Sequence, residues 1–243
     1  MHKRIVAATL AVLPLFAGAA DITVSAAASL TNAFRELASS FEAAHPGDRV
    51  LLNFAASDPL VQQIAKGAPV DVFASADQEA MDKAEKQKLL APGTRRDFVS
   101  NTVVLVVPTG SRIASLADLA GAQRLTTGNP ASVPIGRYTQ EALERAGLWA
   151  KLKARFVFGT SVRQSLDYVA RGEADAGFVY ATDVLVQKDK VKAVVTIPTA
   201  TPVRYPIAVI ANAPQPKLAR QFADYAASGA GQAILAKYGF GKP

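Results

Sequence analysis

Short apolar runs alternate with amphipathic segments along the chain from residue 21 onward. Residues 22–26 predict a β-strand, and the next segment is predicted to be a helix that the His45-Pro46-Gly47 turn ends. The apolar side chains of that helix fall on one face: Leu30, Ala33, Phe34, Leu37, Ala38 and Phe41. Strands over residues 50–54 and 70–74 follow, separated by a helix with Pro59 in its first turn. This alternation predicts an α/β fold with a largely parallel, helix-covered sheet.

A second set of such units occupies the middle of the chain. Its strands are predicted at residues 103–107, 124–127, 156–158 and 176–180, and its helices at 138–146 and 162–170. Another apolar run covers residues 205–211, and one alanine-rich helix is predicted from 216 to 238. We interpret the runs near 103 and 207 as two chain crossings between lobes. The expected organisation is lobe I at residues 21–102 with 205–243 and lobe II at residues 103–204, each a sheet flanked by helices.

The first 20 residues have the pattern of a cleavable signal peptide. Lys3 and Arg4 precede an apolar stretch at residues 5–16, and Ala17-Gly18-Ala19 forms an A-x-A cleavage site. The apolar stretch is shorter than the roughly 20 residues that span a bilayer. We therefore expect cleavage after Ala19 or Ala20 and a soluble mature protein that is exported to the periplasm.

Composition narrows the possible chemistry. Half of the 243 residues are apolar and none is cysteine, which excludes a disordered chain, a disulfide scaffold and thiolate chemistry. The formal charge of +7 falls to +5 without the leader, which leaves 25 basic and 20 acidic side chains. The basic residues form no stripe interleaved with aromatics, so we expect no nucleic-acid partner. At most, this excess of positive charge steers small anions.

The predicted strand-to-helix turns carry the most informative residues. They lie at residues 26–29, 55–59, 128–136 and 159–162 and consist of small residues with a hydroxyl or a proline near the helix start. Ser29, Ser57 or Ser161 alone would be interpreted as an ordinary helix N-cap. Together, two turns from each lobe predict a cleft lined by helix N-termini, which suits a fully ionised oxyanion.

The sequence argues against an enzyme and against a bound metal cation. A serine nucleophile needs an activating base, and His45 is the only histidine after the leader, in a turn expected to be exposed. The chain has no G-x-S-x-G, H-E-x-x-H, Walker or G-x-G-x-x-G motif. Asp71, Asp77 and Asp82 show no calcium-loop pattern, and Asp77 is predicted to cap a helix. We expect no catalytic residue, no cofactor and no directly coordinated metal.

Four segments carry a resemblance to a known family: AAASLTNA at residues 26–33, GAPVDVFASAD at 67–77, VPIGRY at 133–138 and VYATD at 179–183. They resemble the signatures of the periplasmic molybdate-binding proteins of ABC transporters, over residues 21–240. The first two segments, in this order and spacing, are specific to that family. The resemblance implies a two-lobed periplasmic binding protein of type II-like fold. It also implies a molybdate or tungstate ligand, a membrane ABC permease as partner and a monomer.

The resemblance also implies which residues hold the anion. Ser29 and Ser57 match serines that bind through the hydroxyl and the backbone N–H. Ile135 and Val162 match positions that donate a backbone N–H, and Tyr180 matches a tyrosine that donates its hydroxyl. The residue types alone favour apolar packing for Ile135 and Val162 and a core aromatic for Tyr180. The metal would be held as its oxyanion.

One position departs from the family pattern. Where the family commonly has a small residue after the second serine, this chain has Asp58, followed by Pro59. An ionised carboxylate facing a dianion would cost several kcal/mol at low dielectric, so we expect Asp58 to cap its own helix instead. Whether Asp58 contributes its backbone N–H or weakens binding stays open.

Two alternative functions remain open from the sequence. One is a sulfate- or phosphate-binding transport protein, which belongs to the same class. The other is an exported hydrolase that uses Ser29 or Ser57 as its nucleophile.

Overall fold

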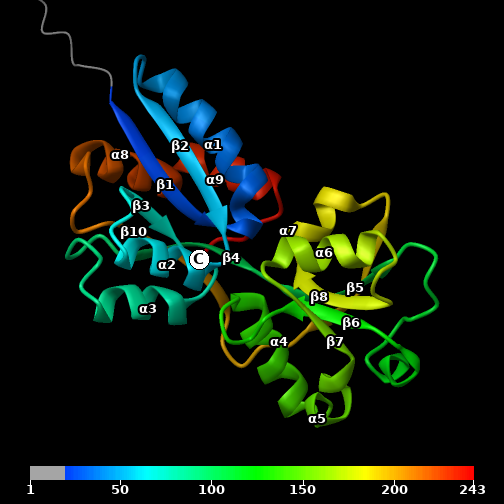
Figure 1. Ribbon diagram of the computed structural model, residues 1–243. Helices are drawn as coiled ribbons and strands as arrows, with labels where there is room; N and C mark the ends of the chain where they lie inside the picture. The colour runs from blue at the N-terminus through cyan, green and yellow to red at the C-terminus, as the bar shows by residue number, and fades with distance from the viewer. Residues whose placement is uncertain (1–19) are drawn as a thin grey trace, which may run out of the picture.

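Two five-stranded sheets form the framework of the two lobes in the computed structural model, which describes residues 20–243 (Figure 1). The expected signal peptide therefore lies almost entirely outside the described residues. The first sheet has the order β2-β1-β3-β10-β4. Its strands are β1 (Asp21–Ala27), β2 (Arg49–Ala55), β3 (Val72–Ala74), β4 (Arg96–Asn101) and β10 (Val203–Val209). The second sheet has the order β7-β6-β8-β5-β9. Its strands are β5 (Val103–Pro108), β6 (Leu125–Gly128), β7 (Phe156–Gly159), β8 (Ala176–Tyr180) and β9 (Val191–Ile197).

Both sheets are mixed, whereas the strand–helix alternation predicts largely parallel sheets. In the first, β1 is parallel to β2 and β3, but β10 is antiparallel to β3 and β4. The second repeats this arrangement: β6 is parallel to β7 and β8, and β5 is antiparallel to β8 and β9. The antiparallel strands are those beside the chain crossings, where no βαβ connection fixes the strand direction.

Helices cover both sheets. Around the first sheet lie α1 (Thr31–Ala44), α2 (Ser57–Ala65), α3 (Gln78–Lys86), α8 (Pro216–Ala227) and α9 (Gly229–Lys237). The second lobe contains α4 (Pro134–Arg145), α5 (Trp149–Leu152), α6 (Val162–Ala170) and α7 (Ala181–Val184). The single helix predicted over residues 216–238 is wrong, because the run divides at Ser228. The Ser228 hydroxyl accepts a hydrogen bond from the Gly231 amide (3.2 Å) and so starts α9 as an N-cap.

The core of the first lobe confirms the apolar face predicted for α1. Ala33, Phe34, Leu37, Ala38 and Phe41 are all buried. Phe222 on α8 meets both α1 rings edge-on, with centroids 6.1 Å from Phe34 and 5.3 Å from Phe41. Such aromatic pairs stabilise the packing of α8 against α1 beyond the apolar area they bury. The C-terminal helices thus belong to the same lobe as the N-terminal strands.

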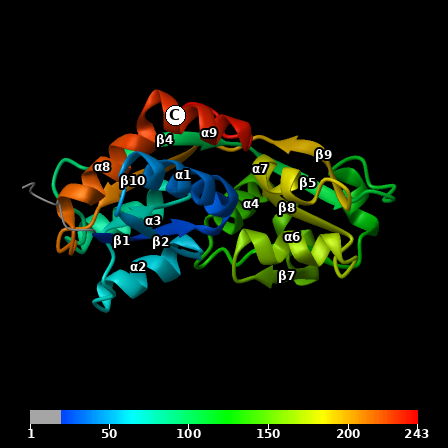
Figure 2. The ribbon, with the colours of Figure 1, turned by 90° about the horizontal axis from the view of Figure 1, so that it is seen from above.

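The chain passes between the sheets twice. β4 ends at Asn101 and β5 begins at Val103, while β9 ends at Ile197 and β10 begins at Val203. Figure 2 shows β4 and β10 in one lobe beside β5 and β9 in the other. A hydrogen bond from Asn101 Nδ2 to Thr182 Oγ1 (2.9 Å) joins the lobes next to the first crossing. Within residues 20–243, no helix has the length and apolar character needed to span a bilayer.

Candidate anion-binding site

A small cavity lies between the two lobes, and all five residues that the sequence predicts as ligands line it: Ser29, Ser57, Ile135, Val162 and Tyr180. The rest of the lining consists of small or apolar residues: Ala27, Ala28, Ala56, Ala76, Val133 and Pro134. The lining described by the structure therefore contains neither a charged side chain nor a histidine. Any anion in this cavity has to be held by neutral hydrogen-bond donors.

The cavity is surrounded by the starts of helices. Ser57 and Val162 are the first residues of α2 and α6, and Ile135 is the second residue of α4. Ser29 lies in η1, the short 3-10 turn (Ala28–Leu30) that leads into α1. The first amides of an α-helix have no acceptor within the helix, and its N-terminus carries partial positive charge. The fold thus directs backbone donors from both lobes toward one cavity.

Neither cavity serine caps its helix. The N-cap positions of α1 and α2 are Leu30 and Ala56, and neither makes a side-chain capping bond. Ser57 Oγ instead accepts a hydrogen bond from the Ala76 amide (3.0 Å), which leaves its hydroxyl hydrogen able to donate to a ligand. Ser161, by contrast, is an ordinary N-cap that accepts from the Gln164 amide. The N-cap interpretation is therefore right for Ser161 and wrong for Ser57.

The hydroxyl of Ser29 is paired with a residue that the sequence does not single out. Ser29 Oγ lies 3.0 Å from the Tyr205 hydroxyl, which also accepts a hydrogen bond from Asn101 Nδ2 (3.3 Å). Tyr205 lies on β10, beside a chain crossing, in a run that appears in the sequence only as an apolar strand. Tyr205 thus links Ser29 to β10, on which it lies, and to Asn101 at the end of β4. No local sequence signal could have revealed a partner 176 residues away.

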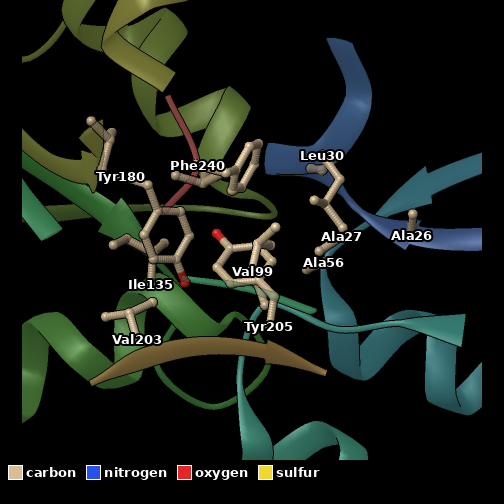
Figure 3. Close-up of a cluster of buried hydrophobic side chains, with 14 of the residues drawn as sticks. Ala26, Ala27, Leu30, Ala56, Val99, Ile135, Tyr180, Val203, Tyr205 and Phe240 are labelled. Atoms are coloured by element: carbon tan, nitrogen blue, oxygen red, sulfur yellow. The ribbon is translucent and has the colours of Figure 1, made fainter. Parts of the chain in front are cut away.

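Tyr180 lies at the end of β8 with its hydroxyl buried and, within residues 20–243, without a hydrogen-bond partner. Figure 3 shows its ring beside that of Tyr205; the two ring centroids are 5.6 Å apart. Burial, followed by the charge effects of Tyr205 and Tyr138, raises the pKa of Tyr180 well above 10.0. The hydroxyl therefore stays protonated and able to donate.

The raised pKa gives a prediction for alkaline solution. Because a raised tyrosine pKa extends the neutral, donating form upward in pH, we expect the affinity of the cavity for an oxyanion to stay constant between pH 7.5 and about 10. Tyr180→Phe should lower the affinity at every pH by about 1.5–3 kcal/mol, the range for a hydrogen bond to a charged group. Calorimetry across this range tests both. Affinity that falls with a midpoint below pH 10 in wild type, but not in Tyr180→Phe, would contradict the raised pKa of Tyr180.

Asp58 does not cap its own helix, so that prediction is wrong. Its carboxylate contacts Lys83 Nζ on α3 (2.6 Å) and Arg137 Nη2 on α4 (2.7 Å). The same Arg137 contacts Asp77 Oδ2 through Nη2 (2.6 Å) and Nε (2.8 Å). Asp77 also caps α3 by accepting from the Ala80 amide, as predicted. Two basic partners thus neutralise the carboxylate beside Ser57, which the sequence could only mark as a problem.

The described residues place no histidine near the serines. His45, the only histidine among residues 20–243, is half-buried rather than exposed; its ring stacks on Phe41 (centroids 4.0 Å apart) and its Nδ1 lies 2.9 Å from the Phe41 carbonyl oxygen. It is thus engaged at the far end of α1 from Ser29. Within the same residues, no cluster of three or more His, Cys, Asp or Glu side chains is placed to hold a metal ion.

The protein has two lobes that are joined by two crossings of the chain, and the cavity between them is lined by neutral hydrogen-bond donors. This arrangement is typical of a solute-binding protein. The chain matches the family described as bacterial extracellular solute-binding protein over residues 22–241, and it belongs to that family. Its membership in a family of binding proteins confirms the two-lobed fold class and the expectation that the chain is not an enzyme.

Particular relatives are more specific. The chain is 40% identical to the molybdate-binding protein ModA of Mycobacterium bovis over 93% of this chain and 86% of that protein. It is 36% identical to ModA of Haemophilus influenzae over 93% of this chain and 91% of that protein. The solved periplasmic molybdate-binding protein of Azotobacter vinelandii superposes with a TM-score of 0.80 at 25% identity, covering 91% of this chain and 99% of that one. These relatives confirm the resemblance to the molybdate-binding family.

Proposed function

We propose that this protein binds molybdate between its two lobes and delivers it to the membrane permease of an ABC transporter. The observation that carries the proposal is the cavity lined by helix starts and hydroxyls from both lobes. The molybdate-binding relatives support the choice of anion. In the proposed site the hydroxyls and amides of Ser29 and Ser57, the amides of Ile135 and Val162 and the Tyr180 hydroxyl donate to the anion oxygens.

The polarity of the cavity supports a fully ionised anion. A monoprotonated anion such as hydrogen phosphate carries a proton of its own, which a carboxylate in the site accepts best. The described lining holds no carboxylate, because Asp58 and Asp77 are turned to Arg137. Molybdate, tungstate and sulfate therefore satisfy the donors without leaving a proton unpaired. Tungstate has nearly the size of molybdate and belongs to the proposal, whereas the smaller sulfate leaves longer hydrogen bonds.

Thermal unfolding with the four anions side by side tests the proposal. A ligand at 100 times its Kd stabilises the native state by about 2.7 kcal/mol. For a protein of this size, that corresponds to a Tm increase of about 5–11 °C. We expect this increase with molybdate and tungstate at low concentration, and not with sulfate or phosphate. An equal or larger shift with sulfate would favour the sulfate-binding alternative.

We further propose the organisation and setting in which this binding takes place. The two lobes comprise residues 21–102 with 205–243 and residues 103–204. The strands of the two sheets support this division, although β10 of the first sheet begins two residues earlier, at Val203. They close over the anion by rotating at the crossings. The family is extracellular, and we place the protein in the periplasm as a monomer, exported by the leader at residues 1–20.

A further inference from the structure

Two arginines of the second lobe, Arg137 and Arg163, contact residues of the first lobe. Arg137 follows Ile135 by two residues on α4 and reaches Asp58 and Asp77. Arg163 follows Val162 directly on α6. It donates from Nη1 to Asn32 Oδ1 (2.9 Å) and from Nη2 to the Ser29 carbonyl oxygen (3.2 Å). Each arginine thus joins a proposed backbone donor of one lobe to a residue at or next to a proposed ligand serine of the other.

The Arg137 contacts are well shielded from water. The side chains of Arg137, Asp58 and Asp77 are 16%, 8% and 5% exposed. Arg137 contacts both carboxylates, and its guanidinium contributes two nitrogens to Asp77. Separating the lobes would break all of these contacts at once, whereas the Lys83–Asp58 pair lies within one lobe and would survive. These charge-assisted hydrogen bonds across the two lobes favour the closed arrangement.

The Arg163 contacts cross the cavity to neutral oxygens. Its Nε is held at 2.7 Å from Asp183 Oδ1 in its own lobe, which fixes the guanidinium so that Nη1 and Nη2 face α1 and η1. Asp183 is fully buried and also accepts from the Tyr180 amide (3.2 Å). The same carboxylate thus orients both Arg163 and the strand end that carries Tyr180.

We propose that Arg137 and Arg163 are positioning residues that hold the lobes closed and so set how slowly the anion leaves. Because both bridges are made between protein groups, they also favour closure when no anion is bound. The Arg137 bridge reaches Asp58, a neighbour of Ser57, and the Arg163 bridge reaches the carbonyl oxygen of Ser29, which is not a proposed donor to the anion. The effect on anion release rests on the proposed function, but the effect on lobe closure does not.

The absence of native cysteine allows a direct measurement of closure. Leu51 on β2 and Val157 on β7 are exposed on edge strands of the two sheets, and Leu51→Cys with Val157→Cys provides a dye pair for single-molecule energy transfer. In the absence of anion we expect the closed-to-open ratio to fall about tenfold or more in Arg137→Met and in Arg163→Met, since each loses a shielded bridge. Lys83→Met, which removes only the contact within one lobe, should leave the ratio within about threefold.

Two further variants separate closure from misfolding. Arg137→Lys keeps the charge but loses the forked geometry and should restore part of the ratio. Asp77→Asn in the Arg137→Met background removes the carboxylate whose ion pair Arg137 supplied, and should also restore part of the ratio. Relative to wild type, we expect the rate constant for molybdate dissociation to rise in each variant as its closed-to-open ratio falls. The association rate constant should change little.

The outcomes are distinguishable. An equal anion-free ratio in wild type and in both arginine variants would overturn the proposal, whatever molybdate does. A wild type that fails to bind molybdate while the arginine variants still shift the anion-free ratio would overturn the proposed function and support the bridges. Lys83→Met breaks no contact between the lobes. If it lowered the closed-to-open ratio as much as Arg137→Met does, the proposal would also be overturned.

Discussion

Replacing Ser29 and Ser57 together by alanine is expected to weaken molybdate binding more than any other substitution of side-chain atoms in the cavity. Each hydroxyl is placed to donate to a dianion, and a hydrogen bond to a charged group contributes about 1.5–3 kcal/mol. The single variants should therefore lose roughly 10- to 150-fold in affinity. The double variant should lose the product of the two factors if the sites are independent.

A matched control is present in the same kind of turn. Ser161 caps α6 but does not line the cavity, so Ser161→Ala should lower stability by about 1 kcal/mol and leave the affinity within a few-fold. Calorimetry with molybdate and thermal unfolding of each variant measure both quantities. If the double variant bound molybdate as tightly as wild type, the proposed site would be wrong. If the two single variants lost different amounts of affinity, the difference would reflect the hydrogen bond between Ser29 and Tyr205, which has no counterpart at Ser57 within residues 20–243.

Gly136→Ala is expected to disrupt the proposed site by displacing the start of α4, which carries Ile135. A Cβ at Gly136 would lie 2.1 Å from the Gly128 carbonyl oxygen and 2.7 Å from the Pro130 nitrogen. Both neighbours are backbone atoms, so the start of α4 has to move away from the loop after β6. That movement displaces the amide of Ile135, one of the proposed donors. We expect a loss of about 1–3 kcal/mol in unfolding free energy from overpacking and a loss of affinity of tenfold or more.

The control for this variant is Gly121→Ala, since a Cβ there meets nothing within 4 Å and its backbone is not in the left-handed region. It should change neither stability by more than about 0.5 kcal/mol nor affinity measurably. Denaturant unfolding and calorimetry on both variants give the comparison. Unchanged molybdate affinity in Gly136→Ala, with lowered stability, would remove Ile135 from the proposed donors.

The elements at the site were predictable because their signals are local. The spacing of apolar residues along the chain predicts the buried face of α1 and the strand β1. These two elements place Ser29 where the strand meets the helix. Ile135 and Val162 were different: a backbone donor has no side-chain signature, so only the motifs shared with a known family could indicate them. The structure places both at helix starts in the cavity lining.

The contacts that complete the cavity were not predictable, because they join distant parts of the chain. Tyr205 meets Ser29 across 176 positions, and Arg137 meets Asp58 across 79 and Asp77 across 60. No periodicity relates such residues, and only the crossing of the chain between lobes brings them together. For the same reason the sequence does not indicate that β5 and β10 run antiparallel to their neighbours, since their direction depends on where the chain returns.

The sequence by itself determined the alternating strands and helices of an α/β chain, and the motifs that it shares with a known family indicated the class of protein. Its hydroxyl-bearing helix starts suit the binding of an oxyanion. The tertiary structure decided how the charged residues around that site are reconciled with an anion. Asp58 beside a dianion site would be repulsive in isolation, but Arg137 from the other lobe and Lys83 compensate it. Compensation between charges depends on distance in space, and that distance is set only when the two lobes meet.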